Sequence, residues 1–249
     1  FNSVYFDNND RLFSYSGYNC RVSEALIHSG RAGKGWADMR AAECNLEVVD
    51  FQQLLEFYRD PQRFFLKNIA GIDVNERGQG PEDSEPFELD NLQIYQAAHE
   101  ILEAVLKKGD PSLLAEKLQI SLQWPLGTPG TLAYDELLEE ITVFAGVLNE
   151  LDMGVRLEGR DFSLDLSGVR LAGVLDHCYQ KGQLMYRFSS FKGRDLILAW
   201  LHHLVAACVR DRSLPTWMLT RDSSGNFLPG DDSAPQLDYL VELYQRGCE

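Results

Sequence analysis

The sequence predicts an α/β fold of the α+β type, in which a mixed central sheet is flanked by helices and preceded by extra N-terminal helices. Three features predict it: apolar residues recur at helical spacing through much of residues 50–150, short alternating segments follow within 155–188, and a helix, a strand and a closing helix complete the chain. With 249 residues, of which 45% are hydrophobic, the chain can bury a large core.

Capping residues mark the first expected helices. Asp50 can cap a helix that runs through Tyr58, and Asp60 precedes the next helix, with Pro61 at the favoured first position. Aromatic residues at helical spacing in this region predict faces that pack in a core.

A second group of helices is expected from Asn91 onward. One broad apolar face of the first helix is formed by Leu92, Tyr95, Ala98, Ile101, Leu102, Val105 and Leu106. We expect a shorter helix from Pro111 and a long one at about 130–150.

Short strands are expected after the long helix. The four segments are 155–157, 162–166, 169–177 and 183–188, and Gly-containing turns separate them. This order predicts an antiparallel meander. The remaining expected elements are a helix at 200–209, a strand at 216–219 and a helix at about 236–244.

Residues 1–48 are rich in turn residues, and we expect them to form a connecting segment from a preceding domain, with residues 49–249 as the main domain. The segment 73–90 is acidic, contains Gly and Pro, and predicts a loop. Because the chain begins at Phe1 and not at a methionine, we expect a piece of a longer protein.

The net charge of −15, from 23 Lys and Arg against 38 Asp and Glu, argues against a simple DNA-binding domain, since duplex phosphates repel such a body on average. Two local basic groups are candidate DNA contacts: Arg59, Arg63 and Lys67, and Arg187, Lys192 and Arg194. The alternative is that both groups are solvated faces that balance nearby acids. An acidic surface also suits docking to a basic partner.

Several classes of protein are disfavoured. Five cysteines without a Cys-x-x-Cys pair argue against a disulfide framework or a zinc ribbon and favour a reducing cytoplasm. No apolar run is long enough to cross a bilayer, and no signal peptide is expected. Gly33-Lys34-Gly35 lacks the remainder of a phosphate-binding loop, so we expect no bound ATP. His202 and His203 are adjacent on a helix, point about 100° apart, and are expected to be surface or half-buried histidines rather than metal ligands.

Three fragments follow one another in the order of a nuclease metal site. They are Gly130-Thr131-Leu132-Ala133-Tyr134, Gly173-Val174-Leu175-Asp176 and Ser190-Phe191-Lys192-Gly193. This order resembles the RecB-type branch of the PD-(D/E)XK nucleases, whose pattern is Gly-Thr-x-x-His, Gly-x-x-Asp and Asp-Tyr-Lys-x-Gly. Here Tyr134 replaces the histidine and Ser190 replaces the second metal-binding aspartate.

One carboxylate and one hydroxyl form a poor Mg²⁺ site, because this ion prefers several oxygen ligands in octahedral geometry. The resemblance therefore implies degenerate nuclease positions at Tyr134, Asp176, Ser190 and Lys192, with no catalytic residue and no metal. If the fold is of this type, Asp176 near the end of the third strand and Lys192 just past the fourth meet at one sheet edge, where they can form an ion pair.

A wider resemblance covers nearly the whole chain. It is carried by Tyr5-Phe6-Asp7, Arg11-Leu12-Phe13-Ser14-Tyr15, Phe57-Tyr58-Arg59-Asp60-Pro61-Gln62-Arg63-Phe64-Phe65-Leu66, Glu85-Pro86-Phe87-Glu88-Leu89-Asp90, Gly173-Val174-Leu175 and Trp200-Leu201-His202-His203-Leu204-Val205. These stretches are similar to the C-terminal region of the RecC family, the gamma subunits of bacterial exodeoxyribonuclease V. That family carries a domain with the nuclease fold but without its active site.

Three functions remain open. The RecC resemblance implies a non-catalytic domain of the RecBCD helicase-nuclease, in contact with RecB-like and RecD-like helicase subunits, that guides or splits DNA in the assembled complex. The second possibility is an active Mg²⁺ nuclease in which Asp165, Glu136 or Glu139 replaces the missing acid. The third is a purely structural interaction module that never touches DNA.

Overall fold

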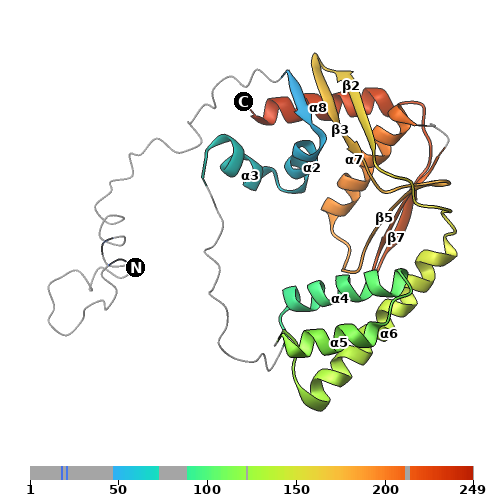
Figure 1. The fold of residues 1–249 in the computed structure, drawn as a ribbon. Helices are drawn as coiled ribbons and strands as arrows, with labels where there is room; N and C mark the ends of the chain where they lie inside the picture. The colour runs from blue at the N-terminus through green and yellow to red at the C-terminus, as the bar shows by residue number, and fades with distance from the viewer. Residues whose placement is uncertain are drawn as a thin grey trace. The chain divides into compact units, whose positions relative to one another are not determined.

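The computed structural model describes residues 18, 21, 47–72, 89–121, 123–210 and 214–248. The chain divides into two compact units, Phe1–Ala42 and Glu43–Glu249, and the second contains all the elements named below. The predictions for the aromatic residues before position 47, for Gly33-Lys34-Gly35 and for most of the loop 73–90 lie outside the described residues. The second unit combines helices with mixed sheets, which confirms the α+β class (Figure 1).

The first helices begin where the capping residues predict. Strand β1 (Val48–Asp50) leads directly into helix α2 (Phe51–Arg59), and Asp50 Oδ1 accepts hydrogen bonds from the backbone N–H groups of Gln52 and Gln53 at 2.8 and 3.2 Å. Helix α3 (Pro61–Phe64) is capped by Asp60 and continues into a π-helical turn, η3 (Phe65–Ile69).

Three helices, α4 (Asn91–Leu106), α5 (Pro111–Ile120) and α6 (Gly127–Glu150), lie side by side (Figure 1). A capping box begins α4, in which Asp90 and Gln93 each accept the other's backbone N–H, at 2.6 and 3.0 Å. The predicted apolar face of α4 is buried at Ala98, Ile101 and Leu102, but Leu92 and Tyr95 at its N-terminal end are 61% and 40% exposed. The buried face of α4 is therefore narrower than its sequence indicates.

The strands form two mixed sheets. The first has the order β1-β3-β2, where β2 (Arg160–Leu166) and β3 (Val169–Leu175) are antiparallel and β1 runs parallel to β3. The second has the order β4-β5-β6-β7. There β4 (Cys178–Tyr179) and β5 (Gly182–Arg187) form a hairpin, β6 (Thr216–Thr220) is parallel to β5, and β7 (Ser224–Phe227) is antiparallel to β6.

The prediction of one continuous antiparallel meander is wrong in two respects. Residues 155–157 form no strand; they make an isolated bridge between Arg156 and Tyr179 and two backbone hydrogen bonds to the start of the hairpin. The predicted strand 169–177 ends at Leu175, because His177 adopts a left-handed conformation (φ 59°) that turns the chain out of the first sheet. The strands after this corner belong to the second sheet.

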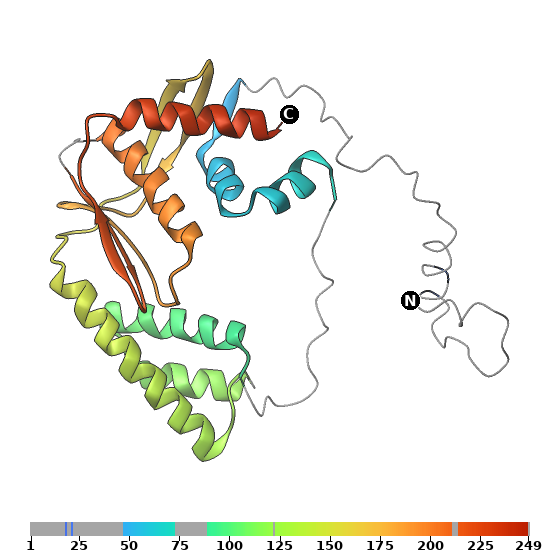
Figure 2. The ribbon, with the colours of Figure 1, turned by 180° about the vertical axis from the view of Figure 1, so that it is seen from behind.

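Two long helices complete the unit. Helix α7 (Gly193–Val209) begins seven residues before the predicted position, and α8 (Ser233–Cys248) runs beside α7 and across the first sheet (Figure 2). The earlier start of α7 has a local cause: Asp195 Oδ2 accepts the backbone N–H of Lys192 at 2.9 Å, which caps the first turn.

Two hydrophobic cores hold these layers. The first lies between the sheet β1-β3-β2 and helices α2, α7 and α8, and includes the fully buried Leu54, Leu171, Leu201 and Leu237. The second lies between α4, α6 and strands β5 and β6, around Ile101, Ile141 and Trp124. Within the described ranges, no helix is both long enough and apolar enough to cross a membrane.

Candidate functional site

Tyr134, at the position of the nuclease histidine, is a buried packing residue of α6. Its ring makes an edge-to-face contact with Trp124, with centroids 6.0 Å apart, and its hydroxyl donates to the carbonyl of Pro111 at 2.6 Å. Burial, followed by the charge of Asp110, raises the pKa of Tyr134 to about 12, so the phenol stays protonated at neutral pH. Tyr134 therefore joins α6 to the start of α5.

The glycines of the motif lie in tight contacts. A Cβ atom on Gly173 would lie 2.7 Å from Phe51 Cβ, where strand β3 meets helix α2, and one on Gly130 would lie 1.8 Å from the carbonyl oxygen of Pro125. The Gly130 carbonyl also accepts the indole N–H of Trp124 at 2.8 Å. Both glycines thus serve packing.

Asp176 is exposed and lies just after β3, whereas the sequence predicted it inside the strand, near its end. Ser190 and Lys192 lie between β5 and α7, and the segment is held by a hydrogen bond of 2.7 Å from Phe191 N–H to Asp222 Oδ1. This hydrogen bond is the main reason that the pKa of Asp222 is lowered.

The ion pair expected between Asp176 and Lys192 does not form: among the described residues, neither side chain has an ion-pair partner within 4.0 Å. The cap of α7 explains the difference. The backbone N–H of Lys192 is held by the carboxylate of Asp195. The same carboxylate also accepts a hydrogen bond of 2.9 Å from Arg187 Nη2.

The acids considered as replacements lie elsewhere. Asp165 pairs with Arg170, at the opposite end of the β2-β3 hairpin from Asp176. Glu136 and Glu139 are on α6 and line a cavity that does not include Asp176. In the part of the chain that the structure describes, no three His, Cys, Asp or Glu side chains are placed to hold a metal ion. The residues around Asp176 therefore do not fit a Mg²⁺ ion, and we derive no metal-dependent step from them.

The structure brings three of the predicted basic residues together beside Asp176. Two adjoining cavities, of about 410 and 340 Å³, share Arg59, His177, Met185 and Leu198 in their linings. Asp176 lines the first cavity, Arg187 and Arg194 line the second, and Arg59 lines both. We call this pair of cavities the arginine groove. Arg63, Lys67 and Lys192 line neither cavity.

The three arginines are in different electrostatic states. Arg187 is partly buried, with 28% of its side chain exposed, and pairs with Asp195. Within the described ranges, Arg59 and Arg194 make no ion pair, so their guanidinium groups are available to an anion.

Two histidines form the floor of the groove. His177 and His202 rings are 5.6 Å apart, and His202 also contacts the Phe51 ring at 5.1 Å. Burial lowers the pKa of His202 to about 3, and it also lowers the pKa of His177, where Asp176 acts in the opposite direction. Both rings are therefore neutral at pH 7.

His202 and His203 correct the expectation of surface histidines, because both are buried in α7. His203 Nδ1 is 2.9 Å from Thr216 Oγ1, which donates to Gln183 Oε1 at 3.0 Å, so this histidine links α7 to β6 and β5.

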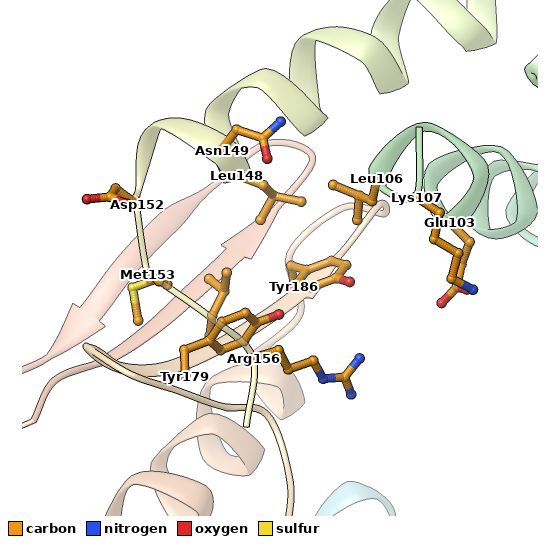
Figure 3. A pocket seen from close by; sticks show the side chains of 12 residues that line it. Glu103, Leu106, Lys107, Leu148, Asn149, Asp152, Met153, Arg156, Tyr179 and Tyr186 are labelled. Atoms are coloured by element: carbon orange, nitrogen blue, oxygen red, sulfur yellow. The ribbon is translucent and has the colours of Figure 1, made fainter. Parts of the chain in front are cut away.

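Sequence reasoning missed a further feature, a cavity of about 500 Å³ lined by Tyr179 and Tyr186 (Figure 3). Tyr186 also lines the arginine groove. The available signal was the placement of aromatic and basic residues, Tyr179, Tyr186 and Arg187, along one hairpin.

Comparison of the sequence with known protein families identifies the family of this chain. The model of the RecC C-terminal domain matches residues 46–249. The chain belongs to the RecC C-terminal domain family. This confirms the resemblance to RecC seen in the sequence.

Curated relatives agree with this assignment. The RecBCD enzyme subunit RecC of Escherichia coli (strain K12) is 26% identical over 207 residues, which cover 81% of this chain and 18% of that protein. RecC of Haemophilus influenzae (strain Rd) is 20% identical over 185 residues, which cover 71% of this chain and 16% of that protein. RecC of Buchnera aphidicola (from Acyrthosiphon pisum) is 20% identical over 157 residues, which cover 63% of this chain and 14% of that protein. The chain therefore spans less than a fifth of the length of these RecC relatives.

Proposed function

We propose that this RecC-family domain is a non-catalytic, nuclease-like part of a RecBCD helicase-nuclease that guides DNA during double-strand break repair. It docks RecB-like and RecD-like subunits, acts in the cytoplasm, and uses no metal or nucleotide cofactor of its own. Family membership supports the assignment to the complex. The arrangement of charge around Asp176 supports the role in DNA guidance.

One observation carries the proposal: the arginine groove holds Arg59 and Arg194, which make no ion pair among the described residues, together with three carboxylates, Asp50, Asp176 and Asp195. Arg187 of the groove also donates to the carbonyl of Ser190, which stands where the nuclease pattern has its second metal-binding carboxylate. Arg59 and Arg194 can contact phosphates, whereas Asp176 alone cannot assemble a Mg²⁺ site. Such a groove can hold a nucleic acid strand electrostatically without cleaving it. Because the net charge of the chain is −15, this attraction is local and strongly dependent on salt.

A second surface supports docking to a partner subunit. Glu136, Glu139, Glu140 and Asp222 line a cavity of about 860 Å³ together with Val143, whose side chain is 66% exposed, and Arg221, which pairs with Glu140. Four carboxylates against one arginine, beside exposed apolar groups, repel DNA and favour a basic protein surface. The two surfaces meet at strand β6, where Leu219 and Thr220 line both the acidic cavity and the arginine groove.

Binding of a fluorescent single-stranded oligothymidine to the 249-residue chain tests the DNA role. Replacing Arg59 and Arg194 by Ala should weaken binding at low salt, and each lost phosphate contact should reduce the salt slope by about 0.7 for a single strand. Arg246→Ala is the matched control, because Arg246 is exposed on α8 and lines neither cavity of the groove. Equal loss of affinity in the control and in the groove variants would exclude the groove as the binding site.

A further inference from the structure

The tyrosine-lined cavity, which we call the tyrosine cavity, is built by three parts of the fold. Helix α4 contributes Glu103 and Lys107, the end of α6 contributes Leu148 and Asn149, and the hairpin β4-β5 contributes Tyr179 and Tyr186. Figure 3 shows the two phenol hydroxyls on the side of the cavity that faces Arg156, Glu103 and Lys107. At about 500 Å³, the cavity is in the size range of sites for small ligands.

The lining combines an apolar floor with half-buried aromatic rings. Leu148, Met153 and Leu184 are buried below the opening, whereas Tyr179 and Tyr186 are partly exposed. Burial, followed by the neighbouring Tyr179, raises the pKa of Tyr186, so its phenol is neutral and does not repel an anion. Two neutral aromatic rings at the mouth of an apolar cavity suit a flat aromatic ligand.

The charges around the cavity are paired, with one exception. Glu103 pairs with Lys107, and Asp152 pairs with Lys181. Among the described residues, Arg156 makes no ion pair, and its charge acts on both Tyr186 and His177. The surplus cation at this cavity is therefore a guanidinium group that can bind a phosphate.

The tyrosine cavity continues the arginine groove. Tyr186 lines both. His177 lines the groove, and its pKa is lowered by burial and by the charge of Arg156. A strand whose phosphates contact Arg59 and Arg194 would therefore reach Tyr186 by following the wall of the groove.

We infer that the tyrosine cavity binds one unpaired nucleobase of a single-stranded nucleic acid, which stacks on Tyr186 and Tyr179 while Arg156 contacts the adjoining phosphate. The inference rests on the proposed function and deepens it, because the arginine groove then binds the phosphates of the strand and the tyrosine cavity is a separate site for a base. A base held in a duplex cannot enter such a cavity, since its ring faces are already stacked. The site thus distinguishes single strands from duplex DNA.

The test uses an oligothymidine with one central 2-aminopurine, whose fluorescence falls when it stacks, together with the anisotropy of a labelled oligothymidine. Tyr179→Ala and Tyr186→Ala should each weaken binding by about 5- to 100-fold, the range for loss of one base-aromatic stack, and should remove the quenching. Tyr186→Phe keeps the ring and should keep the quenching. Tyr239→Ala, which removes an exposed tyrosine on α8, should bind like wild type.

Two outcomes would overturn the inference, and they differ in what they leave standing. If Arg59 and Arg194 govern binding but the tyrosine variants match Tyr239→Ala, the base site is wrong and the DNA-guiding role survives. If no variant of the arginine groove or the tyrosine cavity changes single-strand binding, both proposals fail. If Tyr186→Ala weakened binding of the duplex of the same sequence as much as binding of the single strand, the base site would also be wrong.

Discussion

The glycines of the degenerate motif have a structural role that does not depend on catalysis. Gly173 lets β3 approach Phe51 of α2, and Gly130 lets the start of α6 pass the carbonyl of Pro125. The chain keeps these glycines while Tyr134 and Ser190 replace the ligands of the nuclease pattern. At the residue scale, the two glycines of the motif are therefore explained by packing alone.

Alanine substitutions test this packing role. Gly130→Ala and Gly173→Ala should each lower the free energy of unfolding by about 1–3 kcal/mol, because the new methyl group overlaps Pro125 or Phe51. Gly146→Ala is the matched control: its Cβ would meet no atom within 4 Å, and alanine in a helix interior should raise stability by about 0.5–1 kcal/mol. Urea titration gives all three values, and unchanged stability in Gly173→Ala would contradict the close contact of β3 with α2.

Residue types alone predicted part of this site. Strand periodicity and turns predicted Asp176 near the end of the third strand and Lys192 just past the fourth, at one sheet edge. In the structure β3 and β5 belong to different sheets, and the two side chains form no ion pair, because Asp195 holds the start of α7. The convergence of Arg59 with Arg187 could not be predicted, because it depends on how α2 packs against α7 and β3, more than 100 residues later in the sequence.

At the scale of elements, Asp50, Pro61 and Pro111 located the starts of α2, α3 and α5, whereas the division of the strands into two sheets was missed. Alternation of polar and apolar residues cannot reveal the left-handed backbone of His177, and this single residue separates the strands into two sheets. At this corner between the two sheets, the ring of His202 of α7 packs between His177 and Phe51.

The buried His202 makes the stability of the fold sensitive to acid. The pKa of His202 is about 3 in the folded chain and 6.5 for an ordinary histidine, so between these values the unfolded chain binds more protons, and stability falls as the pH falls. From pH 7 to pH 5, His202 should contribute a loss of about 2 kcal/mol. The lowered pKa of His177 adds to the loss in the same direction.

Urea titrations at several pH values measure this effect. His202→Leu should flatten the dependence between pH 7 and pH 5, and His99→Gln, which replaces an exposed histidine of α4, should leave it as in wild type. A His202→Leu variant with the full wild-type slope would show that another group causes the acid sensitivity.

At the scale of the whole molecule, the arginines without an ion pair and the largest group of carboxylates line different cavities. The chain has a net charge of −15, yet Arg59, Arg194 and Arg156, which make no ion pair among the described residues, lie along cavities that share lining residues, while Glu136, Glu139 and Glu140 line another with Arg221. Composition argued against an autonomous duplex-binding domain, and it could not reveal how the charged residues are distributed over the cavities. We expect DNA guidance on the cationic cavities and subunit docking on the acidic one.

Incubation of one end-labelled single-stranded DNA with the 249-residue chain in Mg²⁺ and in Mn²⁺, recording both binding and strand length, tests DNA guidance without cleavage. We expect the DNA to bind, with loss of affinity in Arg59→Ala and Arg194→Ala, and its length to stay unchanged. Metal-dependent cleavage that Asp176→Ala abolishes would disprove a non-catalytic role, because it would show that Asp176 still assembles a working nuclease site.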